Sequence, residues 1–290
     1  MAPDILKTIE AANAERIARQ LSVHPLEYLK ELCSNPESGR GYLAEQGFSP
    51  APRPPRCFED ALRRPGLSFI CEVKKASPSK GVIDAGFPYL DIARSYERAG
   101  ADCISCLTEP QWFMGSDAIF MDIRQQVGTP MIRKDFTVGD GYGDYGLTLG
   151  EYQIYQAKLM GADAVLLIAA LLDTASIEHF LAIAADLGLS ALVEAHTAKE
   201  ISSAVDAGAT VIGVNNRNLH DFTVDFENAR RLRDCIPDTC LYVAESGISS
   251  IADVETIAEI GADAVLVGEM LMRSENREAT LAQMRKAGAR

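Results

Sequence analysis

The 290-residue sequence lacks any uninterrupted apolar stretch of about 18 residues, the length that a membrane-spanning helix needs. Its start, Met1 to Gln20, mixes acidic, basic and alanine residues and has no apolar signal core. We therefore expect a cytoplasmic protein with no membrane partner. Because 47% of the residues are hydrophobic, the chain can still bury a large core, and an α/β barrel of this length can be one domain.

Basic residues are fewer than acidic residues. The 28 lysine and arginine residues face 41 aspartate and glutamate residues, so the formal net charge is −13 at pH 7. This charge would repel a nucleic acid or an anionic membrane, and we expect neither as a partner. A small anionic substrate stays compatible with it, because Lys74, Lys75 and Lys80 form a local basic cluster, and Arg133 and Lys134 follow further along.

Cysteine and histidine are sparse and show no ligand pattern. The cysteine count, seven, is odd, which argues against a complete disulfide framework. Cys103 and Cys106 have the CxxC spacing, but no second pair follows at zinc-site distance, and both lie in an apolar run where cysteine usually packs as a small hydrophobe. The four histidines are scattered and form no HExxH motif. The sequence therefore predicts no metal site.

A glycine-alanine pair, a polar residue and an apolar run recur together along the chain. The copies are Gly100–Leu107, Gly161–Ile168, Gly208–Val214 and Gly261–Val267. Each follows a stretch with helical spacing, so the glycine is expected to end a helix in a left-handed cap before a short turn enters a strand. Apolar strands that alternate with amphipathic helices are typical of a parallel sheet covered by helices.

Four more apolar runs are predicted to be strands, namely Phe69–Lys74, Pro130–Lys134, Ala191–Glu194 and Leu241–Glu245. Eight strands alternating with helices predict the α/β class and a single (β/α)8 TIM barrel. An open doubly wound sheet is the structural alternative. It would more often carry a GxGxxG turn after its first strand, and the sequence has none.

Residues 1–66 precede the barrel, to which we assign residues 67–290. Helical spacing covers Ile5–Leu21 and Pro25–Glu31, and a proline-rich connector follows at Ser49–Arg56. We expect this N-terminal helical extension to cover the amino-terminal end or one rim of the barrel.

Polar side chains stand at the ends of five predicted strands. Catalytic groups of TIM barrels lie at the carboxyl ends of strands, where residues two apart share a face. Charged residues often follow a buried strand simply because the chain reaches solvent, but six such groups at one rim are harder to explain in that way. Buried lysines and glutamates must be paired or used, which suits acid–base chemistry. The six candidates are Glu72, Lys74, Lys134, Glu194, Asn215 and Glu245.

Small residues follow the last two predicted strands, in Glu245-Ser246-Gly247-Ile248 and Val267-Gly268-Glu269-Met270. Small side chains let backbone N–H groups approach an anion, and TIM barrels often bind phosphate with these two loops. The alternative is that the glycines only form tight turns.

The segment Glu72-Val-Lys-Lys-Ala-Ser-Pro-Ser-Lys-Gly81 resembles the signature of the indole-3-glycerol phosphate synthase family. Supporting motifs follow in the expected order, and the resemblance spans nearly the whole chain. They are Thr108-Glu-Pro, Phe113-Met-Gly-Ser116, Ile132-Arg-Lys-Asp-Phe136, Val165-Leu-Leu-Ile168, Leu192-Val-Glu194, Gly213-Val-Asn-Asn-Arg-Asn-Leu219, Ala244-Glu-Ser-Gly-Ile248 and Val267-Gly-Glu269.

The resemblance implies a carboxy-lyase of tryptophan biosynthesis that needs no organic cofactor or metal. Its substrate would be 1-(2-carboxyphenylamino)-1-deoxyribulose 5-phosphate, which loses CO₂ and water to give indole-3-glycerol phosphate. Lys134 would be the general acid at the ketone, and Lys74 would contact the carboxylate. Glu194 and Glu72 would handle protons in the dehydration. The remaining two candidates, Asn215 and Glu245, would orient the substrate and the lysines.

The resemblance also implies binding residues. Arg217 would reach the substrate carboxylate. The phosphate positions of the family match Ser77, Ser246, Gly247, Gly268 and Glu269, the last through its backbone N–H. An apolar wall for the aromatic ring would come from Phe113, Phe136 and Leu219, which could equally be ordinary core residues.

One departure from the family is the tract from Val138 to Glu151, which contains a glycine-rich segment and is longer than the usual link to the helix at Tyr152. We expect a mobile loop here. Since it follows Lys134 closely, we hypothesise that it acts as a lid.

Two alternative functions stay open at this point. Another phosphate-binding barrel, such as phosphoribosylanthranilate isomerase, typically uses a cysteine and an aspartate at strand ends, whereas the first strand here ends in Glu72 and Lys74 and places Cys71 on the other face. A non-catalytic binding barrel would not need an acid–base set. We expect a monomer or a weak homo-oligomer.

Overall fold

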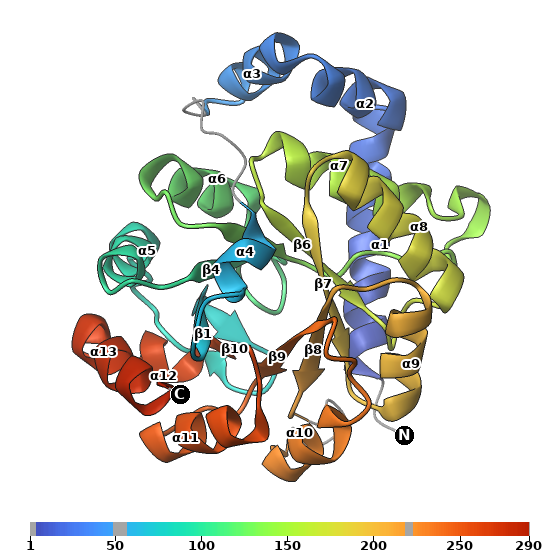
Figure 1. Ribbon diagram of the computed structural model, residues 1–290. Coiled ribbons are helices and arrows are strands. Elements are labelled where there is room, and N and C mark those ends of the chain that lie inside the picture. Colours follow the sequence, from blue (N-terminus) through green and yellow to red (C-terminus); the bar gives the residue numbers. More distant parts are fainter. Residues whose placement is uncertain (1–3, 49–56, 218–222, 290) are drawn as a thin grey trace.

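The computed structural model describes residues 4–48, 57–217 and 223–289, and it shows a closed barrel of eight parallel strands in the order β1-β10-β9-β8-β7-β6-β5-β4 (Figure 1). This confirms the predicted TIM barrel. The barrel strands are β1 (Ser68–Val73), β4 (Cys103–Leu107), β5 (Met131–Lys134), β6 (Ala164–Ile168), β7 (Ser190–Ala195), β8 (Val211–Asn215), β9 (Leu241–Glu245) and β10 (Ala264–Val267). A short antiparallel hairpin, β2 (Ala76–Ser77) and β3 (Gly81–Val82), which we did not predict, follows β1.

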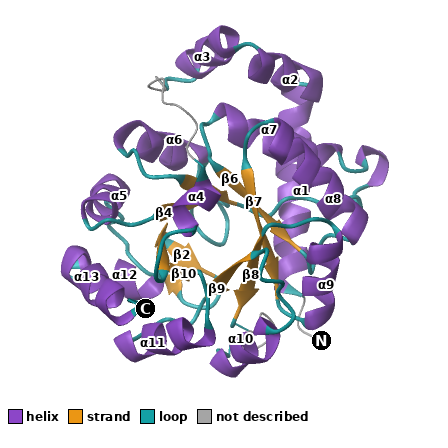
Figure 2. Cartoon of the chain, viewed as in Figure 1, coloured by secondary structure: helices purple, strands orange, loops and turns teal. Residues whose placement is uncertain are grey.

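Helices surround the ring of strands, as Figure 2 shows. They are α5 (Tyr89–Arg98), α6 (Asp117–Gln126), α7 (Thr148–Leu159), α8 (Thr174–Asp186), α9 (Ala198–Asp206), α10 (Phe226–Arg233), α11 (Ile251–Ile260), α12 (Glu269–Met272) and α13 (Arg277–Ala287). The repeated glycines have left-handed backbones, with φ of 81° at Gly100 and 91° at Gly261. Glycine tolerates this conformation without strain, so the helix-ending role predicted for the repeat is confirmed.

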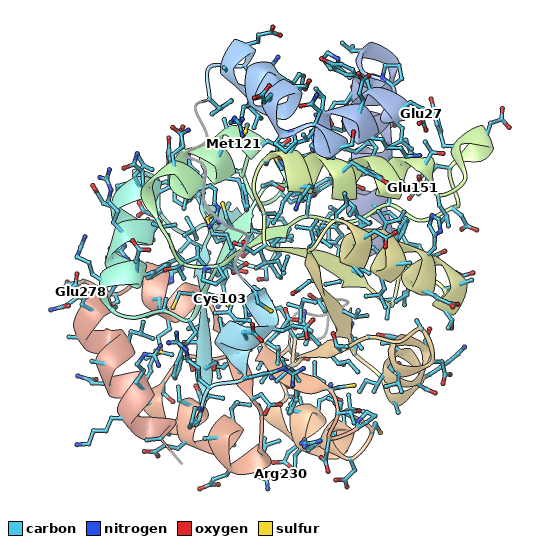
Figure 3. The ribbon with its side chains drawn as sticks, turned by 45° about the horizontal axis from the view of Figure 1, so that its top comes forward. Glu27, Cys103, Met121, Glu151, Arg230 and Glu278 are labelled. Atoms are coloured by element: carbon cyan, nitrogen blue, oxygen red, sulfur yellow. The ribbon has the colours of Figure 1, made fainter. Side chains whose placement is uncertain are left out.

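Successive side chains along each strand point alternately into the barrel and out toward the helices, so the strands contribute to two hydrophobic cores. Side chains such as Ile70, Leu166 and Val243 point into the barrel, whereas Phe69 and Val193 pack outward against the helices. Figure 3 shows Cys103 among the strands and Glu278 and Arg230 on peripheral helices. Because inward positions recur every second residue, the last inward position of each strand reaches the carboxyl end of the barrel.

The N-terminal extension contains α1 (Ile5–Val23), α2 (Leu26–Ser34), α3 (Pro36–Glu45) and α4 (Phe58–Leu62), of which α3 and α4 were not predicted. Phe58 and Leu62 of α4 pack under the barrel interior, at the amino ends of β1 and β4. Helix α1 lies against α7, and Leu6 and Ile9 join the same interior cluster. The division into 1–66 and 67–290 stays a prediction.

The link between β5 and α7 is shorter than we predicted, because the helix begins at Thr148 rather than at Tyr152. The loop lies against α1, where the Gly139 N–H donates to Glu10 Oε1 at 3.1 Å. None of the described residues from 138 to 151 lines the cavity discussed below. The lid hypothesis therefore finds no support in this structure.

A search of the described residues finds no helix whose length and apolarity would let it cross a membrane.

Candidate active site

A cavity of about 850 Å³ opens at the carboxyl end of the barrel. Fourteen of the fifteen residues predicted from the sequence line it, and the remaining one, Leu219, lies outside the described residues. The fourteen are Glu72, Lys74, Ser77, Phe113, Lys134, Phe136, Glu194, Asn215, Arg217, Glu245, Ser246, Gly247, Gly268 and Glu269. Residues separated by almost 200 positions thus share one chamber because parallel strands place all their carboxyl ends at one rim.

Lys134 lies at the centre of the charged residues on the cavity floor. Its Nζ is 3.9 Å from Glu72 Oε2, 3.8 Å from Glu194 Oε2 and 3.8 Å from Glu245 Oε2. The three carboxylates belong to β1, β7 and β9, and all are buried. One ammonium therefore faces three carboxylates that only the closed barrel brings together.

Lys74, just past β1, forms an ion pair with Glu72 Oε1. Glycine at position 268 makes room for this pair, because a Cβ there would lie 2.4 Å from Glu72 Oε1 and 3.0 Å from Lys74 Nζ. We predicted Gly268 only as part of the phosphate site, and the structure places it against the acid–base residues as well.

Asn215 holds the carboxylate of Glu194 from the neighbouring strand. The Asn215 side-chain amide donates to Glu194 Oε1 at 2.9 Å, which leaves Oε2 facing Lys134. Glu194 is thereby oriented by one neutral donor and one cation, each on a different oxygen.

Neighbouring cationic side chains determine the ionisation of Glu72 and Glu194. Burial raises the pKa of both carboxyl groups, but neighbouring cations outweigh it and the net shift is downward. For Glu72 these are Lys74 and Lys134, and for Glu194 they are Lys134 and His196. Both groups are therefore carboxylates at neutral pH.

Glu245 behaves in the opposite way. Burial raises its pKa well above the usual value, and the negative charges of Glu194 and Glu72 add to the effect, which Lys134 only partly offsets. Its ionisation is therefore less favourable than that of Glu72 and Glu194, whose pKa values shift in the opposite direction.

The pKa of Lys134 is raised, because Glu194, Glu72 and Glu245 together outweigh burial, which acts to lower it. The side chain is a protonated ammonium at neutral pH. A protonated lysine can donate a proton or a charge-assisted hydrogen bond to an oxygen in the cavity.

The predicted phosphate-binding residues form a second part of the cavity. After β9 the chain turns sharply, with φ of 64° at Ser246 and 90° at Gly247, so that this segment lines the chamber. Ser77, from the β2–β3 hairpin, faces the same chamber. Glu269 Oε1 lies 3.6 Å from Lys80 Nζ and 3.0 Å from Arg273 Nε.

Apolar side chains form one wall. The rings of Phe113 and Phe136 lie 6.2 Å apart between centroids and are tilted by 40°. The loop that carries Phe113 is held by Glu109, whose Oε2 accepts the Phe113 N–H at 2.9 Å. Ile5 and Ile9 of α1 also reach the cavity. The two phenylalanines are therefore placed where an aromatic ligand ring can pack.

Sequence reasoning missed several residues that line the cavity. Lys80 was noted only as part of a basic cluster, and Arg273, four residues after Glu269, was not noted. The i,i+4 spacing of Arg273 from Glu269 was a sequence signal that could have identified Arg273. The contribution of α1 had no signal, because its apolar residues look like any helix face. In all, five basic and five acidic side chains line a cavity in a chain whose net charge is −13.

No cluster of three or more histidine, cysteine, aspartate or glutamate side chains suited to a metal ion is found among the described residues. Cys103 and Cys106 are buried free thiols.

Comparison with known proteins decides the family. The family model for indole-3-glycerol phosphate synthase matches residues 43–284. This chain belongs to that family. The synthase of Ruminiclostridium cellulolyticum is 51% identical over 231 residues, which cover 80% of this chain and 85% of the relative. That of Lachnoclostridium phytofermentans is 42% identical over 274 residues, covering 94% and 96%. Membership supports the synthase hypothesis and not the isomerase alternative.

Solved structures support the fold alone. A 3-hexulose-6-phosphate synthase from Salmonella typhimurium matches with a TM-score of 0.58 at 12% identity, covering 76% of this chain and 98% of the other. A thiamine phosphate pyrophosphorylase from Pyrococcus furiosus matches with a TM-score of 0.55 at 18% identity, covering 76% and 94%. At such low identity the likeness concerns the barrel and not the chemistry.

Proposed function

We propose that the chain is an indole-3-glycerol phosphate synthase, a carboxy-lyase that closes the indole ring in tryptophan biosynthesis. Its substrate is 1-(2-carboxyphenylamino)-1-deoxyribulose 5-phosphate, a small phosphate ester with an aromatic carboxylate. The single observation that carries this proposal is Lys134, whose ammonium lies within 3.9 Å of three buried carboxylates on the floor of the cavity.

The cavity divides in a way that suits this substrate. The hairpin and the loops after β9 and β10, with Ser77, Ser246, Gly247, Gly268 and Glu269, take the phosphate. The aromatic ring packs on the apolar wall of the chamber, against Phe113 and Phe136. Arg217 and Lys74 take the carboxylate. The ketone then lies between these two ends, over Lys134.

Ring closure begins when the aryl carbon that bears the carboxylate attacks the ketone carbon. A C–C bond forms, and Lys134 Nζ gives its proton to the ketone oxygen, which becomes a hydroxyl group. The bond to the carboxylate then breaks, CO₂ leaves and the electron pair returns to the ring. A lysine that is fully protonated at neutral pH is suited to this first proton transfer.

Dehydration completes the indole. The hydroxyl group accepts a second proton and leaves as water, while a base removes a proton from the neighbouring CH₂ carbon. We assign the base to the ionised Glu194, and the second proton to the ammonium group of Lys74, which the ionised Glu72 holds in an ion pair. Glu245 orients Lys134 through their ion pair, and Asn215 orients Glu194 by hydrogen bonding.

We further propose that the protein works in the cytoplasm as a monomer or a weak homo-oligomer. Size-exclusion chromatography with light scattering at several concentrations tests the assembly state.

The decisive experiment supplies the purified chain with the carboxyphenylamino sugar phosphate and follows indole absorbance and fluorescence. We expect product formation with release of CO₂. Binding without CO₂ release would favour a non-catalytic barrel. Product from phosphoribosylanthranilate instead would favour the isomerase.

A further inference from the structure

His196 lies beside Glu194 at the carboxyl end of β7. It follows β7 and is two residues past Glu194, but it is not among the residues that line the chamber. Its Nε2 is 3.6 Å from Glu194 Oε1, and 17% of its side chain is exposed. This distance is too long for a good hydrogen bond, so the contact is mainly electrostatic.

The Nε2 atom is buried and has no hydrogen-bond partner among the described residues. An unpartnered buried polar group is costly, so each one calls for a structural or functional reason. The atom that lacks a partner is the one that faces Glu194.

Glu200, on α9, holds the other side of the imidazole. Its Oε2 accepts the His196 backbone N–H at 2.7 Å and lies 3.5 Å from His196 Nδ1. The Asn228 side chain on α10 donates to the His196 carbonyl at 3.4 Å. The ring is thus fixed between a carboxylate in the cavity and a carboxylate on the rim, an arrangement that favours a doubly protonated imidazolium.

The titratable neighbours support this charge state. Burial acts to lower the pKa of His196, but Glu200 and Glu194 outweigh it, and the net shift is upward even though Lys134 opposes it. Glu194, in turn, faces Lys134 from β5 and Glu245 from β9 in addition to His196. Of these charged neighbours, only Lys134 and His196 are cations.

We propose that His196, held by Glu200, is a positioning residue outside the cavity lining that keeps Glu194 ionised and oriented. The inference rests on the proposed function, in which Lys134 gives its proton to the substrate. At that moment Lys134 loses its positive charge, and Glu194 keeps only one cationic neighbour, His196. Glu194 can then still act as the base that dehydration requires.

The test compares the pH dependence of kcat/KM in the wild type and in His196→Gln. Removing the cation raises the pKa of Glu194, so the acidic limb of the profile moves to higher pH. We expect kcat to fall about tenfold, less than loss of the general base itself would cost, with KM unchanged because His196 does not line the cavity. Glu200→Gln should move the limb in the same direction by less, because it lowers the pKa of His196.

His179 provides a matched control, since its Nε2 lies 2.9 Å from Glu151 Oε1 on the outer helices. His179→Gln removes the same kind of pair and should leave the profile unchanged. A His196→Gln profile that coincides with the wild type would overturn the inference, as would a slower enzyme with an unmoved acidic limb. Should that variant fold poorly by circular dichroism, His196→Asn provides the same comparison.

A second measurement separates this inference from the proposed function. Carbon-13 NMR of glutamate carboxyls, with Glu194 assigned through Glu194→Gln, follows the titration of Glu194 without turnover. A higher Glu194 pKa in His196→Gln supports the inference even if the wild type forms no indole. An unchanged pKa overturns it even if the wild type is fully active.

Discussion

Gly213 on β8 leaves the space that the Glu245 carboxyl group on β9 occupies. A Cβ at position 213 would lie 2.0 Å from Glu245 Oε1 and 3.2 Å from Leu192 Cδ1. Because Glu245 lines the open cavity, the displaced carboxyl group would turn into the chamber and leave its place beside Lys134. The acid–base arrangement therefore depends on a residue that has no side chain.

Gly213→Ala should move Glu245 away from Lys134 and lower kcat about tenfold or more, while the fold survives. The measurement is steady-state kinetics together with thermal unfolding. Gly41→Ala on α3 is the control, since a Cβ there meets nothing within 4 Å. Wild-type kcat in Gly213→Ala would show that Glu245 tolerates the displacement and has no positioning role.

Lys134→Met should lose most of its activity and still fold. A missing general acid typically costs ~10²–10⁴-fold in rate. The three carboxylates that lose their cation can take up protons, which the raised pKa of Glu245 already favours, so collapse of the barrel is not expected. Lys199→Met, which changes an exposed lysine on α9, is the control. Wild-type turnover by Lys134→Met would refute the assignment of the general acid.

Glu245→Gln and Glu72→Gln should change stability in opposite directions. The folded-state pKa of Glu245 is raised above its ordinary 4.5, so its contribution to stability is lost as the pH rises from that value. Glu245→Gln removes this loss and should be more stable than the wild type, by a margin that grows as the pH rises above 4.5.

The folded-state pKa of Glu72 is lowered, so its contribution is fully present above 4.5 and is lost only as the pH falls through the folded value. Glu72→Gln should therefore be less stable than the wild type throughout the range from pH 5 to 9. Thermal unfolding across this range measures both differences. A stability loss of the same sign in both variants would contradict the opposite pKa shifts.

Gly247→Val should chiefly weaken substrate binding, because a β-branched side chain both strains the left-handed backbone and obstructs the phosphate side of the cavity. We expect KM to rise more than kcat falls. Gly208→Val is the matched control, since Gly208 has nearly the same φ, 88° against 90°, and is not among the lining residues. Equal effects of the two changes on KM would mean that backbone strain alone is responsible.

The barrel could be predicted because the sequence features that indicate it recur along the chain and each involves only neighbouring residues. The recurrence at Gly100, Gly161, Gly208 and Gly261 marks the ends of helices, and apolar runs mark buried strands, so their alternation determines the architecture. The alternation of side-chain direction along a strand then predicted that Glu72, Lys134 and the other strand-end residues lie at one rim. Short elements such as α3, α4 and the β2–β3 hairpin were not predicted, because a few residues show too little periodicity.

The sequence by itself thus determined which side chains share the chamber. Only the tertiary structure decided their charge states, because a pKa depends on burial and on distances between residues from different strands. Glu194 and Glu245 look alike at the ends of two strands, yet Lys134 and His196 lower the pKa of Glu194, whereas burial and the charges of Glu194 and Glu72 raise that of Glu245. The role of His196 could not be predicted either, since only the folded structure shows that its ring lies between Glu194 and Glu200 and that Lys134 of β5 approaches Glu194 from another strand.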